Sequence, residues 1–171
     1  SASSFAGIGV RHVERVAGSE AIFNGIITAL AQDRSGFIWI GSQQGLVRYD
    51  GYRFRTYQFD PDDDSSLSGN FIRSLWAAPD GRLWIGTNSD GVAIYDPSTD
   101  RFDRFPADTD HPFGLANGRV EAIAPDGADG VWIGTDAGLY RWRNDAQGLE
   151  YFSASNTADT GLTDEHIRAL H

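Results

Sequence analysis

The chain has 171 residues, of which 40% are hydrophobic and 12% aromatic, so it is long and apolar enough to bury a core and does not belong to the disordered class. Its formal net charge of −10 argues against nucleic acid or an anionic membrane surface as a partner. The absence of Cys excludes disulfides, Cys-ligated zinc and iron–sulfur clusters, and no run approaches the ~20 apolar residues of a membrane helix.

Three tryptophan segments mark a repeat along the chain. Residues 37–42, 82–87 and 130–135 read Phe-Ile-Trp-Ile-Gly-Ser, Arg-Leu-Trp-Ile-Gly-Thr and Gly-Val-Trp-Ile-Gly-Thr. The first two tryptophans are 45 residues apart and the second two are 48 apart. A period of this length is typical of repeat architectures.

In chain order, each period predicts four short strands joined by tight turns. The strands of the first period fall at residues 26–30, 37–42, 46–49 and 52–57. Those of the second fall at 71–76, 82–87, 92–95 and 101–105, and those of the third at 120–123, 130–135, 139–142 and 149–152. Asp50-Gly51 is a strong hairpin signal, and no stretch holds a helical period over ten or more residues.

Four antiparallel strands in about 45 residues are the unit of a β-propeller blade. The uninterrupted apolar runs 37–40 and 83–85 predict strands that are buried on both faces, as in stacked blades. We therefore expect an all-β partial propeller with three complete four-stranded antiparallel blades and a leftover strand at each end. The expected blades are residues 24–57, 67–105 and 115–152, preceded by an outer strand and linker in 1–23 and followed by the first strand of a fourth blade in 161–171.

Propellers typically close with about four to eight blades, so three blades leave more than one arrangement open. We expect the chain to be a piece of a longer protein, whose remaining blades complete the propeller. Alternatively, several copies complete a ring, or an open stack is genuine. In each case exposed blade faces and unpaired inner strands favour self-association through the two ends.

The repeat resembles the two-component regulator propeller repeat. The shared pattern is Asp-x-x-Gly-x-x-Trp-Ile-Gly-Ser/Thr, followed by Gly-Leu-x-x-Tyr-Asp-Gly-x-x-Phe, and it is closest from Asp33 to Phe54. The resemblance extends over about residues 24–171. It departs from the pattern at Ala77-Ala78-Pro79 in the second repeat and at Ala124-Pro125 in the third. The third repeat is also expected to carry two extra turn residues.

This resemblance implies a function. Such repeats are found in the extracytoplasmic sensor regions of bacterial membrane receptors, followed by a membrane helix and a histidine kinase, hybrid kinase or diguanylate cyclase. Known members respond to oligosaccharides derived from polysaccharides. The resemblance therefore implies a non-catalytic, periplasmic ligand sensor that is linked to a downstream kinase or diguanylate cyclase module.

The residues themselves point to no catalytic, cofactor or metal site. Asp60, Asp62 and Asp64 imitate the start of a calcium loop, but Ser65 and Phe71 stand where such a loop needs Gly and Glu. None of the four His has a Glu or a second His at metal-ligand spacing. The chain also lacks a nucleophile elbow and a dinucleotide-binding glycine motif.

A ligand is expected where the loops from fourth to first strands and from second to third strands meet around the central channel. Amide and carboxylate groups there suit a hydroxyl-rich ligand, although the same residue types are also common in turns. The candidate ligand-binding residues are Asn24, Gln43, Gln44, Asn70, Arg73, Trp76, Asn88, Asp90, Asn117, Glu121 and Asp136. Of these, Arg73 and Glu121 are expected to line the channel, and Trp76 either packs locally or stacks on a sugar ring.

Two other classes stay open beside the sensor. One is a propeller lectin or a polysaccharide-active enzyme, either a lyase or a glycosidase. The other is a scaffold for protein–protein interactions. Product formation from oligosaccharides would favour the enzyme, and capture of a protein partner without sugar binding would favour the scaffold.

Overall fold

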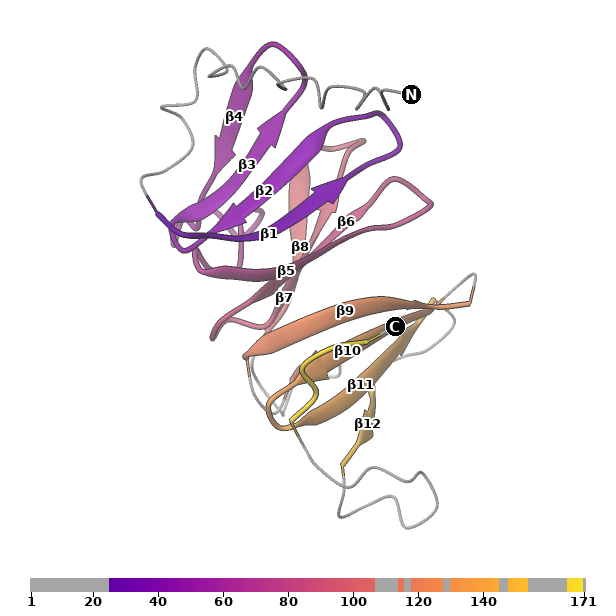
Figure 1. Cartoon of the computed structure of the whole chain (residues 1–171). Coiled ribbons are helices and arrows are strands. Elements are labelled where there is room, and N and C mark those ends of the chain that lie inside the picture. Colours follow the sequence, from indigo (N-terminus) through magenta and orange to yellow (C-terminus); the bar gives the residue numbers. More distant parts are fainter. Residues whose placement is uncertain are drawn as a thin grey trace, which may run out of the picture.

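The computed structural model describes residues 25–106, 114–115, 118–127, 130–144, 148–153 and 166–170. These residues contain twelve β-strands and no helix, which confirms the all-β prediction. The strands form three antiparallel sheets of four, each with its strands in chain order from one edge to the other (Figure 1).

Each sheet is one blade. Blade 1 consists of β1 (Ile27–Gln32), β2 (Ile38–Ser42), β3 (Gly45–Tyr49) and β4 (Phe54–Tyr57). Blade 2 consists of β5 (Ile72–Ala77), β6 (Leu83–Thr87), β7 (Val92–Asp96) and β8 (Arg101–Phe105). Blade 3 consists of β9 (Val120–Asp126), β10 (Gly130–Thr135), β11 (Gly138–Arg143) and β12 (Glu150–Phe152). Their first strands are neighbours, with β1 against β5 and β5 against β9, as in a propeller (Figure 1).

Both faces of blade 2 are buried, as its uninterrupted apolar strand predicts. Successive side chains of a strand point to opposite faces. Along β6, Leu83 and Ile85 enter the core between blades 1 and 2, whereas Trp84 enters the core between blades 2 and 3. Trp39 and Trp84 are 1% and 2% exposed, but Trp132 is only half-buried. No complete sheet covers that face of blade 3 within the described residues.

Asp33 stabilises the turn between the first two strands of blade 1. Its Oδ2 accepts a hydrogen bond from Trp39 Nε1 at 2.8 Å, and its Oδ1 accepts hydrogen bonds from the backbone N–H groups of Ser35 and Phe37 at 2.9 and 3.0 Å. Gly36 completes the turn with a φ of 85°, which a residue without a side chain adopts most readily. This geometry explains why the pattern needs Asp33, Gly36 and Trp39 at fixed spacing.

The equivalent position lies six residues before the tryptophan in every blade and holds Asp33, Ala78 and Asp126. The prediction of two extra turn residues in the third repeat is therefore wrong, because this turn has the same length in all three blades. Asp126 accepts a hydrogen bond from Trp132, as Asp33 does from Trp39. Ala78 has no carboxylate to offer Trp84.

A buried hydroxyl closes the turn between the second and third strands of every blade. It donates to a glycine carbonyl in each case: Ser42 to Gly45 at 3.0 Å, Thr87 to Gly91 at 2.8 Å and Thr135 to Gly138 at 2.9 Å. The same oxygen accepts a backbone N–H of the turn in each blade. The Ser or Thr that ends each Trp-Ile-Gly segment is thus a structural residue.

The glycine of each Trp-Ile-Gly segment allows the next inner strand to approach. A Cβ at these glycines would lie 2.6 Å from a side-chain carbon in three equivalent pairs: Gly41 and Ile72, Gly86 and Val120, and Gly134 and Ile167. Ile167 therefore docks as the first residues of β5 and β9 do, and its N–H donates to the Thr135 carbonyl at 2.9 Å. Residues 166–170 form no strand ladder, and the outer strand expected in 1–23 lies outside the described residues.

Asp100 connects the outer parts of blades 1 and 2. It lies in the turn after β7 with a φ of 58°, a left-handed conformation that Asp and Asn tolerate better than most residues. Its carboxylate accepts hydrogen bonds from Arg55, from Tyr57 at 3.2 Å and from Tyr95 at 2.8 Å. Burial alone would raise the pKa of Asp100, but the bond from Tyr95 and the charge of Arg55 outweigh it and hold that pKa below its ordinary value.

We predict that Gly86→Ala destabilises the fold by about 1–3 kcal/mol, since the new methyl group would overlap Val120 and the Ser74 hydroxyl. Urea unfolding measures the change. Gly25→Ala is the matched control, because its Cβ would meet only the flexible Gln44 side chain at 3.5 Å. Equal unfolding midpoints for the two variants would contradict the close approach of blades 2 and 3.

We predict that Asp100→Asn lowers stability at pH 7 by less than about 1 kcal/mol, because solvent screens the partly exposed pair with Arg55. Asn keeps the left-handed backbone, so the variant removes mainly the charge. A carboxyl group whose pKa is lowered in the folded state stabilises the fold at pH values above its unfolded pKa of about 3.9. This stabilisation is lost as the pH falls through the folded pKa. Urea unfolding at pH 7 and pH 3 should therefore show the difference between wild type and variant shrinking at low pH, and a constant difference would refute the charge contribution.

Candidate functional site

The inner strand of each blade carries one residue that the strand pairing skips at a bulge. These residues are Thr28 in β1, Arg73 in β5 and Glu121 in β9. Arg168 follows Ile167 at the corresponding place after blade 3. Bulges re-aim side chains and are frequent beside functional sites. The bulges therefore place a row of polar side chains along the inner edge of the blades.

Arg73 and Glu121 connect blades 2 and 3 at this edge. Two nitrogens of Arg73, Nε and Nη2, donate to Glu121 Oε2 at 3.0 and 2.7 Å. A third, Nη1, donates to Asn88 Oδ1 at 3.2 Å, and Arg119 Nε donates to the other oxygen of Glu121 at 2.7 Å. Burial alone would raise the pKa of Glu121, but the hydrogen bonds from Arg73 and Arg119 outweigh it and lower that pKa below its ordinary value.

A cavity of about 480 Å³ opens beside this ion pair. It is lined by Arg73, Arg119, Glu121, Asp136, His166, Ile167 and Arg168. The Asp136 Oδ1 atom is buried and accepts no hydrogen bond from any residue that the structure describes. The cavity thus offers cationic donors together with one unsatisfied carboxylate oxygen, an arrangement that suits a ligand with several hydroxyl groups.

The structure brings four of the predicted site residues together, namely Arg73, Asn88, Glu121 and Asp136. Sequence reasoning did not select Arg119 and His166 for this cavity. The signal was present, because each directly precedes the residue that begins or replaces an inner strand, Val120 or Ile167. Asn24 and Asn117 lie outside the described residues.

The remaining polar candidates lie elsewhere. Gln43 and Gln44 are exposed in the turn between β2 and β3. Asn70 Oδ1 accepts the backbone N–H of Phe59 at 2.8 Å, so it orders the link between blades 1 and 2. Asp90 lines a separate hollow of about 370 Å³ with Ser68 and neighbouring residues.

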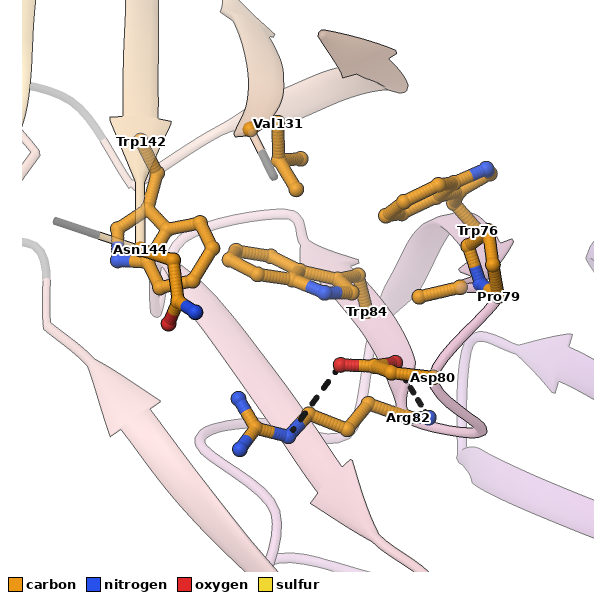
Figure 2. A pocket seen from close by; sticks show the side chains of 10 residues that line it. Trp76, Pro79, Asp80, Arg82, Trp84, Val131, Trp142 and Asn144 are labelled. Carbon is orange, nitrogen blue, oxygen red and sulfur yellow. Dashed lines mark hydrogen bonds and ion pairs between the residues drawn. The ribbon is translucent and has the colours of Figure 1, made fainter. Parts of the chain in front are cut away.

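Trp76 lies at the opposite end of blade 2 from the Arg73 cluster. The antiparallel ladder pairs the start of β5 with the end of β6, and Trp76 with Trp84. There Trp76 lines a cleft of about 180 Å³ between blades 2 and 3, which also contains Trp84 and Trp142 (Figure 2). The Arg73 cluster and the non-recurring tryptophans therefore lie at two separate places in the molecule.

Among the residues with described placement, no three His, Asp or Glu side chains are close enough to share a metal ion. Over the same residues no helix is long and apolar enough to cross a membrane.

The sheets and their polar inner edge define the described part of the chain as consecutive β-propeller blades. Residues 21–44 and 66–89 match the family model of the two-component regulator propeller. These matches contain the first two strands of blades 1 and 2, so the resemblance seen in the sequence is confirmed for two of the three repeats.

The chain is also similar to known proteins. A histidine kinase of Formosa agariphila is 38% identical over 39 residues, which are 23% of this chain and 3% of that protein. The extracellular domain of a hybrid two-component system from B. thetaiotaomicron gives a TM-score of 0.75 at 24% identity, over 84% of this chain and 20% of that chain. A catalytically inactive virginiamycin B lyase from Staphylococcus aureus gives 0.58 at 15% identity, over 76% and 42%. These solved structures share the propeller fold, and this chain spans less than half the length of each relative.

We predict that Arg73→Leu raises the pKa of Glu121 more than Arg119→Leu does. Arg73 donates two hydrogen bonds to Glu121 and its side chain is 25% exposed, whereas Arg119 donates one and is 44% exposed. A carbon-detected NMR titration of the Glu121 carboxyl group measures both pKa values. An unchanged pKa in Arg73→Leu would show that the pair between blades does not form in solution.

Proposed function

We propose that this chain is a non-catalytic, ligand-sensing propeller segment of a bacterial signal-transduction receptor and lies in the periplasm. The observation that carries the proposal is the match of blades 1 and 2 to the two-component regulator propeller. Similar proteins described as a histidine kinase and as the extracellular domain of a hybrid two-component system support it. The output partner would be a linked kinase or diguanylate cyclase module.

The ligand would be an oligosaccharide bound at the cavity beside Arg73 and Glu121. Its hydroxyl groups can donate to the unsatisfied Asp136 Oδ1 and accept from the arginines. Such a site discriminates well, because a ligand without the matching hydroxyl leaves buried polar groups unpaired.

A signal would arise from the contact between blades. Arg73 belongs to blade 2 and Glu121 to blade 3, so a ligand that competes for either side chain changes how the two blades are held together. A ligand shifts such an equilibrium only by its differential affinity for the two arrangements. Blade faces that stay exposed here, as at Ile26 and Leu30, would be covered by further blades or by a second copy of the chain.

The test is calorimetric titration with a panel of oligosaccharides, together with chromatography for products. We expect saturable binding without cleavage. We further expect Asp136→Ala to weaken binding at least about tenfold, the effect of losing roughly 1.4 kcal/mol of hydrogen bonding.

Asp90→Ala is the matched control, because it removes the same charge from the corresponding turn of blade 2 and lies outside this cavity. Equal affinity in Asp136→Ala and the wild type would refute the site. Cleavage of any oligosaccharide would refute the non-catalytic role and favour a propeller enzyme.

A further inference from the structure

The cleft that contains Trp76 lies between blades 2 and 3 and is separate from the cavity beside Arg73. The ring centroid of Trp84 is 6.5 Å from that of Trp76 and 5.1 Å from that of Trp142. Figure 2 shows the Trp84 indole between the other two, with Val131 on one side and Asp80 and Arg82 on the other. Three indoles thus form an apolar wall beside a polar rim.

The same place between blades 1 and 2 is nearly closed. There the space is about 70 Å³, against about 180 Å³ in the cleft of blades 2 and 3. In the smaller space Asp33 lies against Trp39 and bonds its indole N–H at 2.8 Å. The space between blades 1 and 2 is therefore a closed counterpart with which the cleft between blades 2 and 3 can be compared.

Three sequence differences surround Trp84 when the strand registers of the blades are compared. Trp76 stands where blade 1 has Ala31, and Ala78 stands where it has Asp33. Trp142 of blade 3 stands where blade 2 has Tyr95. Two large indoles and one missing carboxylate thus come together at a single cleft.

The missing carboxylate leaves the Trp84 N–H available. No described residue accepts a hydrogen bond from Trp84 Nε1. Among the described residues, the buried side-chain polar atoms without a hydrogen-bond partner are Ser68 Oγ and Asp136 Oδ1. Trp84 Nε1 also lacks a partner within that part of the chain but is not one of these buried atoms, so it retains some exposure to solvent. It is a donor that can be reached from the cleft, although the Trp84 side chain as a whole is only 2% exposed.

We propose that this cleft binds a neutral, hydroxylated saturated ring, namely a single pyranose residue. The apolar face of the ring packs on the indoles, and a hydroxyl oxygen accepts the hydrogen bond from Trp84 that Asp33 accepts from Trp39 in blade 1. Asn144 at the rim can both donate and accept, as a hydroxyl group requires.

The charge of the rim favours a neutral ligand over an ion. Arg82 Nε lies 3.7 Å from Asp80 Oδ2, so the two charges of the rim are paired with each other. The volume of the cleft is below the range of about 300–1,000 Å³ usual for drug-sized ligands, which limits the occupant to one ring.

The test is an NMR titration of the full 171-residue chain with methyl β-pyranosides of glucose, galactose, mannose and xylose, followed through the indole N–H signals. At least one of these probes should shift the signals of Trp84 and Trp142. Ala78→Asp should abolish this shift and weaken binding at least tenfold, because it supplies the carboxylate found in blades 1 and 3. It should also move the Trp84 signal in the free protein, toward a hydrogen-bonded position.

Thr56→Asp is the control, because it adds the same charge at an exposed position of β4 away from the cleft, and it should bind as the wild type does. Should Ala78→Asp not fold, Asn144→Ala at the exposed rim should weaken binding at least threefold. No indole shift with any pyranoside, or equal affinity in the folded variants and the wild type, would overturn the proposal. Shifts with phenol but with no pyranoside would overturn it as well. Asp136→Ala should leave this titration unchanged, so failure here and failure of the cavity beside Arg73 are distinguishable.

Discussion

Each blade is a four-stranded sheet, and the apolar faces between blades are buried against the neighbouring sheets. The Trp-Ile-Gly segment contributes to this packing from one short strand. Its side chains alternate between the two inter-blade cores, and its glycine removes the Cβ that would collide with the next inner strand. The spacing of the blades, the width of the clefts between them and the position of every inner strand depend on this packing.

The indole N–H of the repeated tryptophan has an acceptor in two of the three blades. In blades 1 and 3 an aspartate at the start of the turn accepts this bond. Blade 2 has Ala78 at this position and therefore lacks the acceptor. The indoles of Trp76, Trp84 and Trp142 line the cleft between blades 2 and 3. In our proposal, Ala78 together with Trp76 and Trp142 makes this packing position a site where a ligand is recognised.

The two ends of the interface between blades 2 and 3 differ in chemistry. At one end, paired charges from two inner strands and an unsatisfied carboxylate oxygen surround a polar cavity. At the other, three indoles meet a neutral rim. A ligand at either end contacts both blades, and its affinity therefore depends on their relative position.

The sequence by itself determined the strands, the antiparallel blades and the burial of the tryptophan strands, because each follows from local spacing and from the alternation of side chains. Division of the chain at the expected blade boundaries remains a prediction. The sequence also pointed to Arg73 and Glu121 as residues of the inner edge. Only the tertiary structure decided that these two form an ion pair, that Asn70 orders a loop, and that Trp76, Trp84 and Trp142 share a cleft. The physical reason is that contacts between blades join residues about 30 to 60 positions apart, whose meeting depends on how whole sheets pack, and that the Asn70 contact with Phe59 depends on the path of the link between two sheets.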